Sequence, residues 1–122
     1  MVELLLHTRA AAFVGERIRK EKETLHAPHL LDLEVAQVLR RFARRGEVSS
    51  ERCGTALQDL VDFPLIRHPH GFLLDRIWEL RDSLTAYDAA YVALAEALDA
   101  PLLTRDERLA AARGHNARIE VL

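Results

Sequence analysis

Short apolar runs alternate with longer segments of helical periodicity along nearly the whole chain, and this alternation limits the folds that the sequence can adopt. We expect strands at residues 24–27, 64–68, 101–104 and 117–122. Apolar residues recur at helical spacing in the other segments, so we expect helices at about 2–20, 29–45, 50–63, 71–83, 85–98 and 106–113. Short strands separated by helices are typical of a parallel sheet covered on both faces, and the sequence therefore predicts an α/β fold.

Length and composition favour one compact domain over residues 1–122. The chain is 49% hydrophobic and has only five glycines and four prolines, with no low-complexity tract to separate two domains. The formal net charge is −2, so nucleic-acid binding would depend on a local basic patch rather than on the field of the whole molecule.

The sequence also favours a cytoplasmic protein. The single cysteine, Cys53, cannot form an intramolecular disulfide, and the N-terminus lacks the basic segment of a signal peptide. No apolar run approaches the roughly 20 residues of a membrane-spanning helix. We therefore expect no membrane partner.

Three carboxylates lie in apolar surroundings. Glu34 in the 29–45 helix and Asp88 in the 85–98 helix each have apolar residues one turn away on both sides. Asp106 follows the third expected strand, at the end where an α/β fold opens its cleft. An ionised carboxylate in an apolar environment needs a hydrogen bond or a cation, and acids that converge repel one another. A hard divalent cation is the natural counter-charge for such a group.

Helix capping is an alternative explanation for two of these regions. Thr85 followed by Asp88, and Thr104 followed by Glu107, both have the spacing of a capping box. In such a box the threonine caps the helix, and the acid three residues later accepts a hydrogen bond from the backbone N–H of the threonine. Each cap contributes about 1 kcal/mol of stability. Spacing alone does not separate this interpretation from a metal site.

Other candidate sites have weaker support. His68 and His70 could ligate a metal, but the sequence offers no third ligand nearby. Cys53 lies in the middle of a helix with no histidine placed to activate it. The arginines within 40–45 could bind phosphate, pair with Glu34, or simply complement the C-terminal end of their helix.

Three segments of the chain resemble the PIN-domain ribonucleases, specifically the VapC toxins of bacterial toxin–antitoxin pairs. They are HAPHLLDLEVAQVLRR (26–41), LTAYDAAYVALAEAL (84–98) and APLLTRDERLA (100–110). The resemblance implies a three-layer α/β/α sandwich with a mostly parallel sheet. It also implies a metal-dependent endoribonuclease in which an acidic cluster holds Mg²⁺ or Mn²⁺ and positions a water for attack on an RNA phosphodiester.

The resemblance, together with the chemistry expected of the cleft, assigns roles to five residues. By their motifs, Glu34, Asp88 and Asp106 correspond to the second, third and fourth acids of the family, and they are expected to hold the metal and support catalysis. Thr104 and Arg105, beside the last acid, are expected to contact the substrate. The implied partners are RNA, a small VapB-type antitoxin and a second copy of the chain in a homodimer.

The family's first strand, usually central in the sheet, and the first acid that it carries have no match in this sequence. We therefore expect an N-terminally truncated PIN-like domain, and the activity of this exact polypeptide is expected to be impaired. A misassigned start codon, a degenerate copy and a strand supplied by a partner each explain the difference. We favour the first, because the other three acids and the apolar pattern are intact.

Two competing hypotheses remain. The chain could be a non-catalytic PIN remnant that binds antitoxin or RNA, or an unrelated helical regulator that binds nucleic acid through the arginines within 40–45. A remnant would show no Mg²⁺-stimulated cleavage, and a helical regulator would have no parallel strands.

Overall fold

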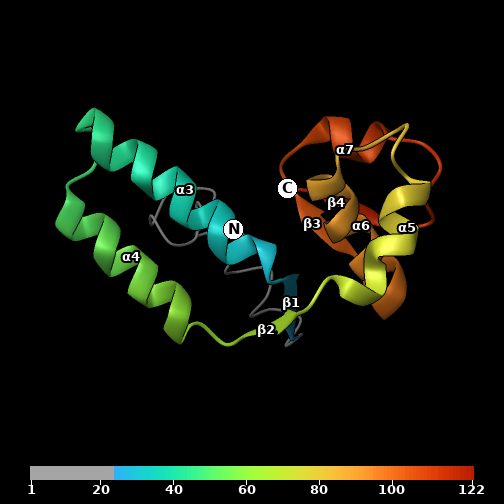
Figure 1. Cartoon of the computed structure of the whole chain (residues 1–122), viewed down its shortest axis with the longest axis horizontal. Coiled ribbons are helices and arrows are strands. Elements are labelled where there is room, and N and C mark those ends of the chain that lie inside the picture. Colours follow the sequence, from blue (N-terminus) through green and yellow to red (C-terminus); the bar gives the residue numbers. More distant parts are fainter. Residues whose placement is uncertain (1–23) are drawn as a thin grey trace. The chain divides into compact units, whose positions relative to one another are not determined.

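The computed structural model describes residues 24–122, and its α/β architecture confirms the expected fold class. The chain divides into two compact units, Met1–Ile66 and Arg67–Leu122 (Figure 1). The helix expected at 2–20 lies outside the described residues. A single domain over the whole chain stays a prediction. Among the described helices, none is long and apolar enough to span a bilayer.

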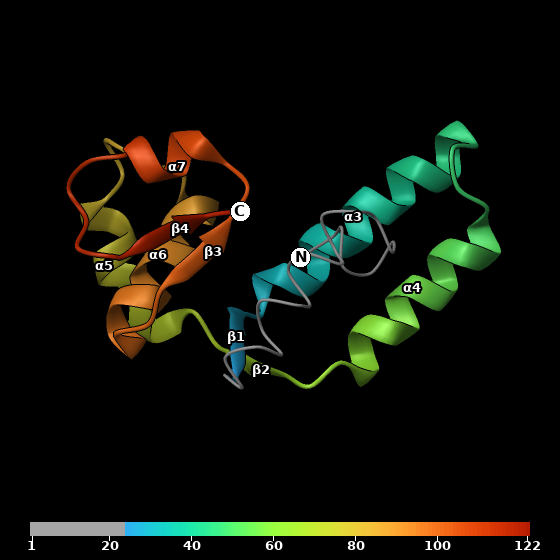
Figure 2. The same cartoon turned by 180° about the vertical axis from the view of Figure 1, so that it is seen from behind.

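The described part of the first unit consists of two helices and two short strands. In chain order these are β1 (Leu25–Pro28), α3 (Leu30–Arg45), α4 (Ser50–Asp62) and β2 (Leu65–His68), whose last two residues belong to the second unit. The two strands pair in a two-stranded sheet. Helices α3 and α4 contact each other as a helical hairpin (Figures 1 and 2). The element positions match the sequence prediction closely.

Local residue chemistry sets the ends of α3 and α4. Gly46 ends α3 in the left-handed conformation, with φ 73°, and its N–H donates to the carbonyl of Ala43 at 3.2 Å. Glycine adopts this conformation without the steric cost that a Cβ would add. Ser49 begins α4, and its hydroxyl accepts from the Arg52 N–H at 3.1 Å. Both positions agree with the helices expected at about 29–45 and 50–63.

The two helices pack through small and branched apolar side chains. Leu31, Val35 and Leu39 are buried at four-residue spacing on α3, and α4 buries Cys53 among its core residues. The Cys53 thiol donates to the Leu39 carbonyl at 3.5 Å, so this cysteine bridges the helices. Its burial in the packed interface agrees with a structural role.

The second unit contains the remaining elements. They are the 3₁₀ helix η1 (Gly71–Leu73), α5 (Leu74–Glu79), α6 (Ala86–Leu98), β3 (Leu102–Thr104), α7 (Glu107–Ala111) and β4 (Ile119–Val121). The strands β3 and β4 are parallel, with Leu102 opposite Ile119 and Thr104 opposite Val121. This pairing confirms the parallel arrangement expected for these strands and is not what a purely helical regulator would show.

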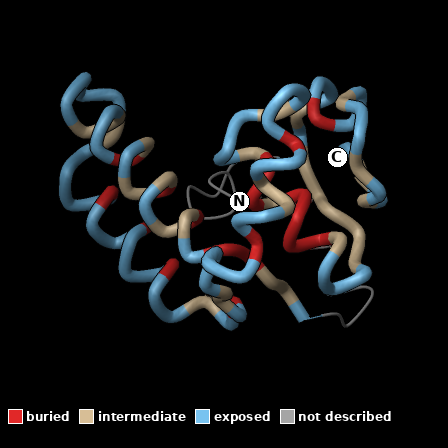
Figure 3. Tube along the Cα trace, turned by 45° about the vertical axis from the view of Figure 1, so that its right-hand side comes forward, coloured by how far each residue is buried: buried red, intermediate tan, exposed pale blue. Residues whose placement is uncertain are grey.

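Helix α6 lies at the centre of the second unit. Ala89 and Val92 of this helix are fully buried and form one cluster with Leu80 and Leu109, against which Leu102 packs. The buried stretches of the chain are red in Figure 3. A helix that is apolar on most of its faces is stable only when other elements cover it. The buried alanine and branched side chains of α6 therefore fix the positions of the elements that pack against this helix.

The helix expected over 71–83 is shorter than the sequence suggested. It begins as a 3₁₀ turn, and α5 ends at Glu79. Beyond it the chain continues in tight turns, in which the Ser83 N–H donates to the Leu80 carbonyl at 3.0 Å and the Leu84 N–H donates to the same carbonyl at 3.0 Å. These turns keep Leu80 buried, so the apolar periodicity of a helix persists where the regular α-helix has stopped.

Candidate functional site

Asp88 lies in the first turn of α6, where Thr85 is the N-cap. The Thr85 hydroxyl accepts from the Asp88 N–H at 3.1 Å, which confirms the threonine cap expected at this position. Asp88 is half-buried, and within residues 24–122 its carboxylate forms no hydrogen bond or ion pair. The positive end of the helix dipole favours the ionised form of such a carboxylate. Within this part of the chain, neither oxygen of the Asp88 carboxylate is engaged.

Asp106 caps the next helix, α7. Its Oδ1 accepts from the Arg108 backbone N–H at 2.9 Å and from the Arg108 Nε at 3.3 Å. These bonds, the side-chain bond first, lower the pKa of Asp106 below its ordinary value. The predicted capping box of Thr104 and Glu107 is wrong, because the N-cap of α7 lies two residues after Thr104, at Asp106 itself.

Thr104 and Arg105 lie between strand β3 and this cap. The Thr104 carbonyl accepts from the Leu122 N–H at 2.8 Å, and its hydroxyl accepts from the Asp106 N–H at 3.0 Å. Thr104 therefore fixes the backbone of Asp106 at the end of the strand, while its own hydroxyl hydrogen can still be donated to a ligand. Arg105 is exposed. The substrate-binding roles of both residues stay predictions.

The packing of α6 brings the two aspartates to the same end of the second unit. The short connection at 99–101 joins α6 to β3, and these two elements pack together, so the start of the helix and the end of the strand share one end. Ala89, next to Asp88, also belongs to the cluster that contains Leu109, three residues after Asp106. The second unit thus provides two carboxylates from two elements.

Glu34, the other predicted ligand, lies in α3 of the first unit, where it is half-buried beside Val35. Its participation in a shared site stays a prediction. Among residues 24–122, no three side chains of His, Cys, Asp or Glu form a group able to hold a metal, which leaves the His68 and His70 alternative without structural support. Two carboxylates still fit Mg²⁺, which takes oxygen ligands and commonly keeps several waters beside one or two carboxylates.

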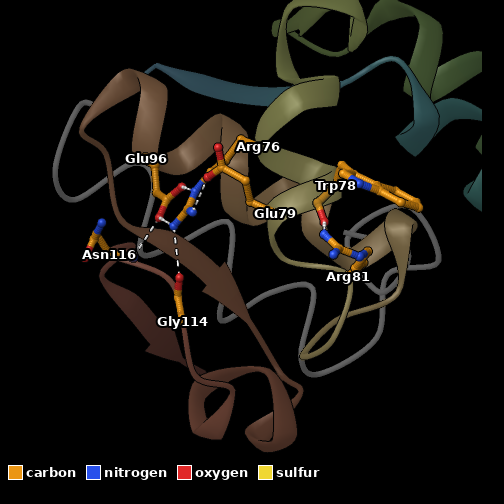
Figure 4. A network of polar contacts seen from close by, with 7 residues as sticks. All are labelled: Arg76, Trp78, Glu79, Arg81, Glu96, Gly114 and Asn116. Atoms are coloured by element: carbon orange, nitrogen blue, oxygen red, sulfur yellow. Dashed lines mark hydrogen bonds and ion pairs between the residues drawn. The ribbon is translucent and has the colours of Figure 1, made fainter.

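Two further polar groups were missed by the sequence analysis (Figure 4). One joins Arg76 to Glu96, which are 20 residues apart and give no local sequence signal. The other places the Arg81 guanidinium over the Trp78 ring, 4.6 Å from its centroid. The spacing of three residues between Trp78 and Arg81 is one at which neighbouring side chains on a helical turn meet, so this pair could have been found.

Comparison with known proteins identifies the family. Residues 1–114 match the family model of the PIN domain. The chain belongs to the PIN-domain family. This PIN domain is 45% identical over 123 residues to ribonuclease VapC1 of Mycobacterium tuberculosis, a match that covers 100% of this chain and 92% of that protein.

Two other VapC ribonucleases are also similar to this PIN domain over most of its length. Ribonuclease VapC12 of Mycobacterium tuberculosis is 41% identical over 121 residues, covering 99% of this PIN domain and 92% of that protein. The VapC ribonuclease Mb0985 of Mycobacterium bovis is 49% identical over 87 residues, covering 71% and 68% respectively. The resemblance to VapC proteins drawn from the three sequence segments is therefore confirmed.

Proposed function

We propose that this PIN domain is an endoribonuclease toxin of the VapC type that hydrolyses RNA phosphodiester bonds with the help of Mg²⁺ or Mn²⁺. The observation that carries the proposal is the 45% identity, over the whole chain, to a protein named ribonuclease VapC1. The pair of carboxylates at one end of the second unit supports the metal-dependent chemistry.

The donor groups suit a hard cation. The Asp88 carboxylate is held at a capped helix start without a cationic partner among the described residues, and the Asp106 Oδ1 accepts hydrogen bonds from Arg108. We assign both to the metal, together with Glu34. A bound divalent ion lowers the pKa of a water ligand and neutralises charge that develops on the phosphate.

The neighbouring residues then orient RNA. The Thr104 hydroxyl accepts from the Asp106 N–H and still has its own hydrogen to donate to a phosphate oxygen. Arg105 follows it on the exposed side of the chain, and a guanidinium can bind a phosphate through two parallel hydrogen bonds. Thr104 and Arg105 therefore position the RNA backbone, while the carboxylates hold the ion.

The partners are part of the proposal. The VapC names of the relatives support pairing with a small VapB-type antitoxin. We also propose that the toxin acts as a homodimer in the cytoplasm. The alternative, a non-catalytic PIN domain that binds antitoxin or RNA, is favoured by the absence of a three-carboxylate group among residues 24–122. Co-purification with the product of a neighbouring short reading frame, and loss of cleavage when that product is added, would support the toxin.

Cleavage of labelled RNA tests the proposal directly. The purified chain is incubated with 5′-labelled RNA in Mg²⁺ or in EDTA, and the products are separated on a denaturing gel. Cleavage should require the metal and should be lost in Asp88→Asn, which keeps the backbone hydrogen bond to Thr85. Asp59→Asn, at an exposed position on α4, is the matched control and should cleave like the parent chain.

A metal-binding experiment shows whether the carboxylates form a metal site at all, whichever of the two candidate functions the protein has. Mn²⁺ should broaden the amide NMR signals around Asp88 and Asp106, and this broadening should disappear in Asp88→Asn but not in Asp59→Asn. Broadening without cleavage would favour the non-catalytic protein. If Mn²⁺ leaves both segments unaffected and RNA stays intact, the metal-dependent nuclease is excluded.

A further inference from the structure

Trp78, the only tryptophan of the chain, is exposed to solvent at 67% of its surface. The Arg81 guanidinium lies 4.6 Å from the centre of its ring, and the Arg81 Nη1 donates to the Trp78 carbonyl at 2.8 Å (Figure 4). The arginine is therefore held from two directions, by the ring and by the backbone. A cation is fixed against an aromatic ring that remains open to ligands.

The pair lies close in sequence and in packing to the proposed metal site. Leu80, between Trp78 and Arg81, is buried in the same cluster as Ala89, which follows Asp88. The Leu84 N–H donates to the Leu80 carbonyl at 3.0 Å, and the next residue along the chain is the Thr85 cap. The turn that carries the pair thus leads directly into the first turn of α6.

The chemistry of the pair suits a nucleobase beside a phosphate. Single-stranded nucleic acids bind through bases stacked on aromatic rings and through cations along their backbone, and arginine contributes to such stacking. An apolar protein partner would instead have to bury the Arg81 charge, which is costly without an acid to pair with it. Within the described residues, Arg81 has no acidic partner.

We infer that Trp78 and Arg81 form a subsite at which one base of a single-stranded RNA stacks on the indole while Arg81 contacts the adjacent phosphate. The inference deepens the proposed function and rests on it, because it extends the path of the RNA from the carboxylates to the preceding turn. Stacking of this kind tolerates any base, so the subsite would contribute affinity rather than sequence recognition.

Intrinsic fluorescence tests the subsite without any cleavage, since Trp78 is the only tryptophan. Asp88→Asn protein is titrated with a single-stranded octaribonucleotide in Mg²⁺, and the RNA is verified as intact on a gel. Binding should quench the emission. An abasic octanucleotide of the same charge should bind without quenching, because it has no ring to stack.

Variants then locate the contact. Trp78→Ala should weaken binding of the octaribonucleotide about 5- to 150-fold in fluorescence anisotropy, the range expected for loss of one base–aromatic stack. Trp78→Phe should restore most of the affinity. Phe72→Ala removes another exposed aromatic side chain of this unit and is the matched control that should bind normally.

Three outcomes would overturn the subsite. They are quenching by the abasic strand equal to that by RNA, unchanged RNA affinity in Trp78→Ala, and an equal loss in Phe72→Ala. A change in oligomeric state of Trp78→Ala in sedimentation, with RNA affinity unchanged, would identify a protein interface instead. Failure of the proposed function is distinct from all of these, because it appears as intact RNA in the cleavage assay whatever the fluorescence shows.

Discussion

Arg76 and Glu96 form a bidentate ion pair in the second unit, with Nε 2.8 Å from Oε1 and Nη2 2.9 Å from Oε2 (Figure 4). Arg76 also donates to the Gly114 carbonyl at 3.0 Å, and Glu96 accepts from the Asn116 N–H at 2.6 Å. The pair therefore joins α5 and α6 to the segment that leads into β4. Because β4 pairs with β3, this contact also supports the strand that ends at Thr104.

Removal of the arginine should destabilise the second unit. Arg76→Ala leaves the Glu96 carboxylate, only 14% exposed, without its cation, and we expect the free energy of unfolding to fall by about 1–3 kcal/mol. Urea denaturation followed by Trp78 fluorescence measures this loss. Arg45→Ala, which removes an exposed ion pair with Glu47, should cost less than about 1 kcal/mol. Equal losses in the two variants would contradict a special role for Arg76.

The same pair should make stability depend on pH in the acid range. The hydrogen bond from Arg76 lowers the pKa of Glu96 below its usual value of 4.5. A carboxyl whose pKa is lowered by folding contributes stability above its unfolded pKa and loses that contribution as the pH falls through the folded value.

The free-energy difference between the parent chain and Glu96→Gln should therefore be constant near neutral pH and shrink as the pH falls below 4.5. Urea midpoints measured across this range test the expectation, with the exposed Glu51→Gln on α4 as the control. A difference that stays constant to strongly acidic pH would show that protonation of Glu96 is not coupled to folding.

Two glycines of the first unit should respond oppositely to alanine. Gly46 has φ 73°, where a Cβ is strained, so Gly46→Ala should lower the free energy of unfolding by about 1 kcal/mol. Gly54 lies inside α4, and an added Cβ would meet nothing within 4 Å. Gly54→Ala should therefore raise the free energy of unfolding by about 0.5–1 kcal/mol. Circular dichroism during thermal or urea unfolding measures both changes. Shifts in the same direction would contradict the assigned helix end.

Much of the fold could be predicted because its signals are local. The helix ends at Gly46, Ser49 and Thr85 depend on backbone preferences and caps that act within three residues, and the strands are short apolar runs between them. Helix α5 was overestimated because its periodicity continues through turns that also bury Leu80. Local patterns cannot distinguish these two structures.

The candidate site was only partly predictable for a related reason. Asp88 and Asp106 stood out because charge in apolar surroundings is visible in one sequence, and the structure places both at the same end of the second unit. The Arg76 and Glu96 pair gave no such signal, because its energy comes from contacts 20 residues apart. Whether Glu34 joins the aspartates depends on contacts between elements distant in sequence, which helical spacing does not encode.

Asp106 has a structural and a proposed chemical role, and two substitutions should separate them. Asparagine accepts hydrogen bonds at an N-cap about as well as aspartate, so Asp106→Asn should keep the bond from the Arg108 N–H and unfold like the parent chain. Asp106→Ala removes the cap and should lower the unfolding midpoint in urea. Both variants should lose Mg²⁺-stimulated RNA cleavage, because an amide is a poor substitute for a carboxylate in holding and neutralising a hard cation. Cleavage retained by Asp106→Asn but lost in Asp106→Ala would assign Asp106 to the helix cap alone and remove it from the metal site.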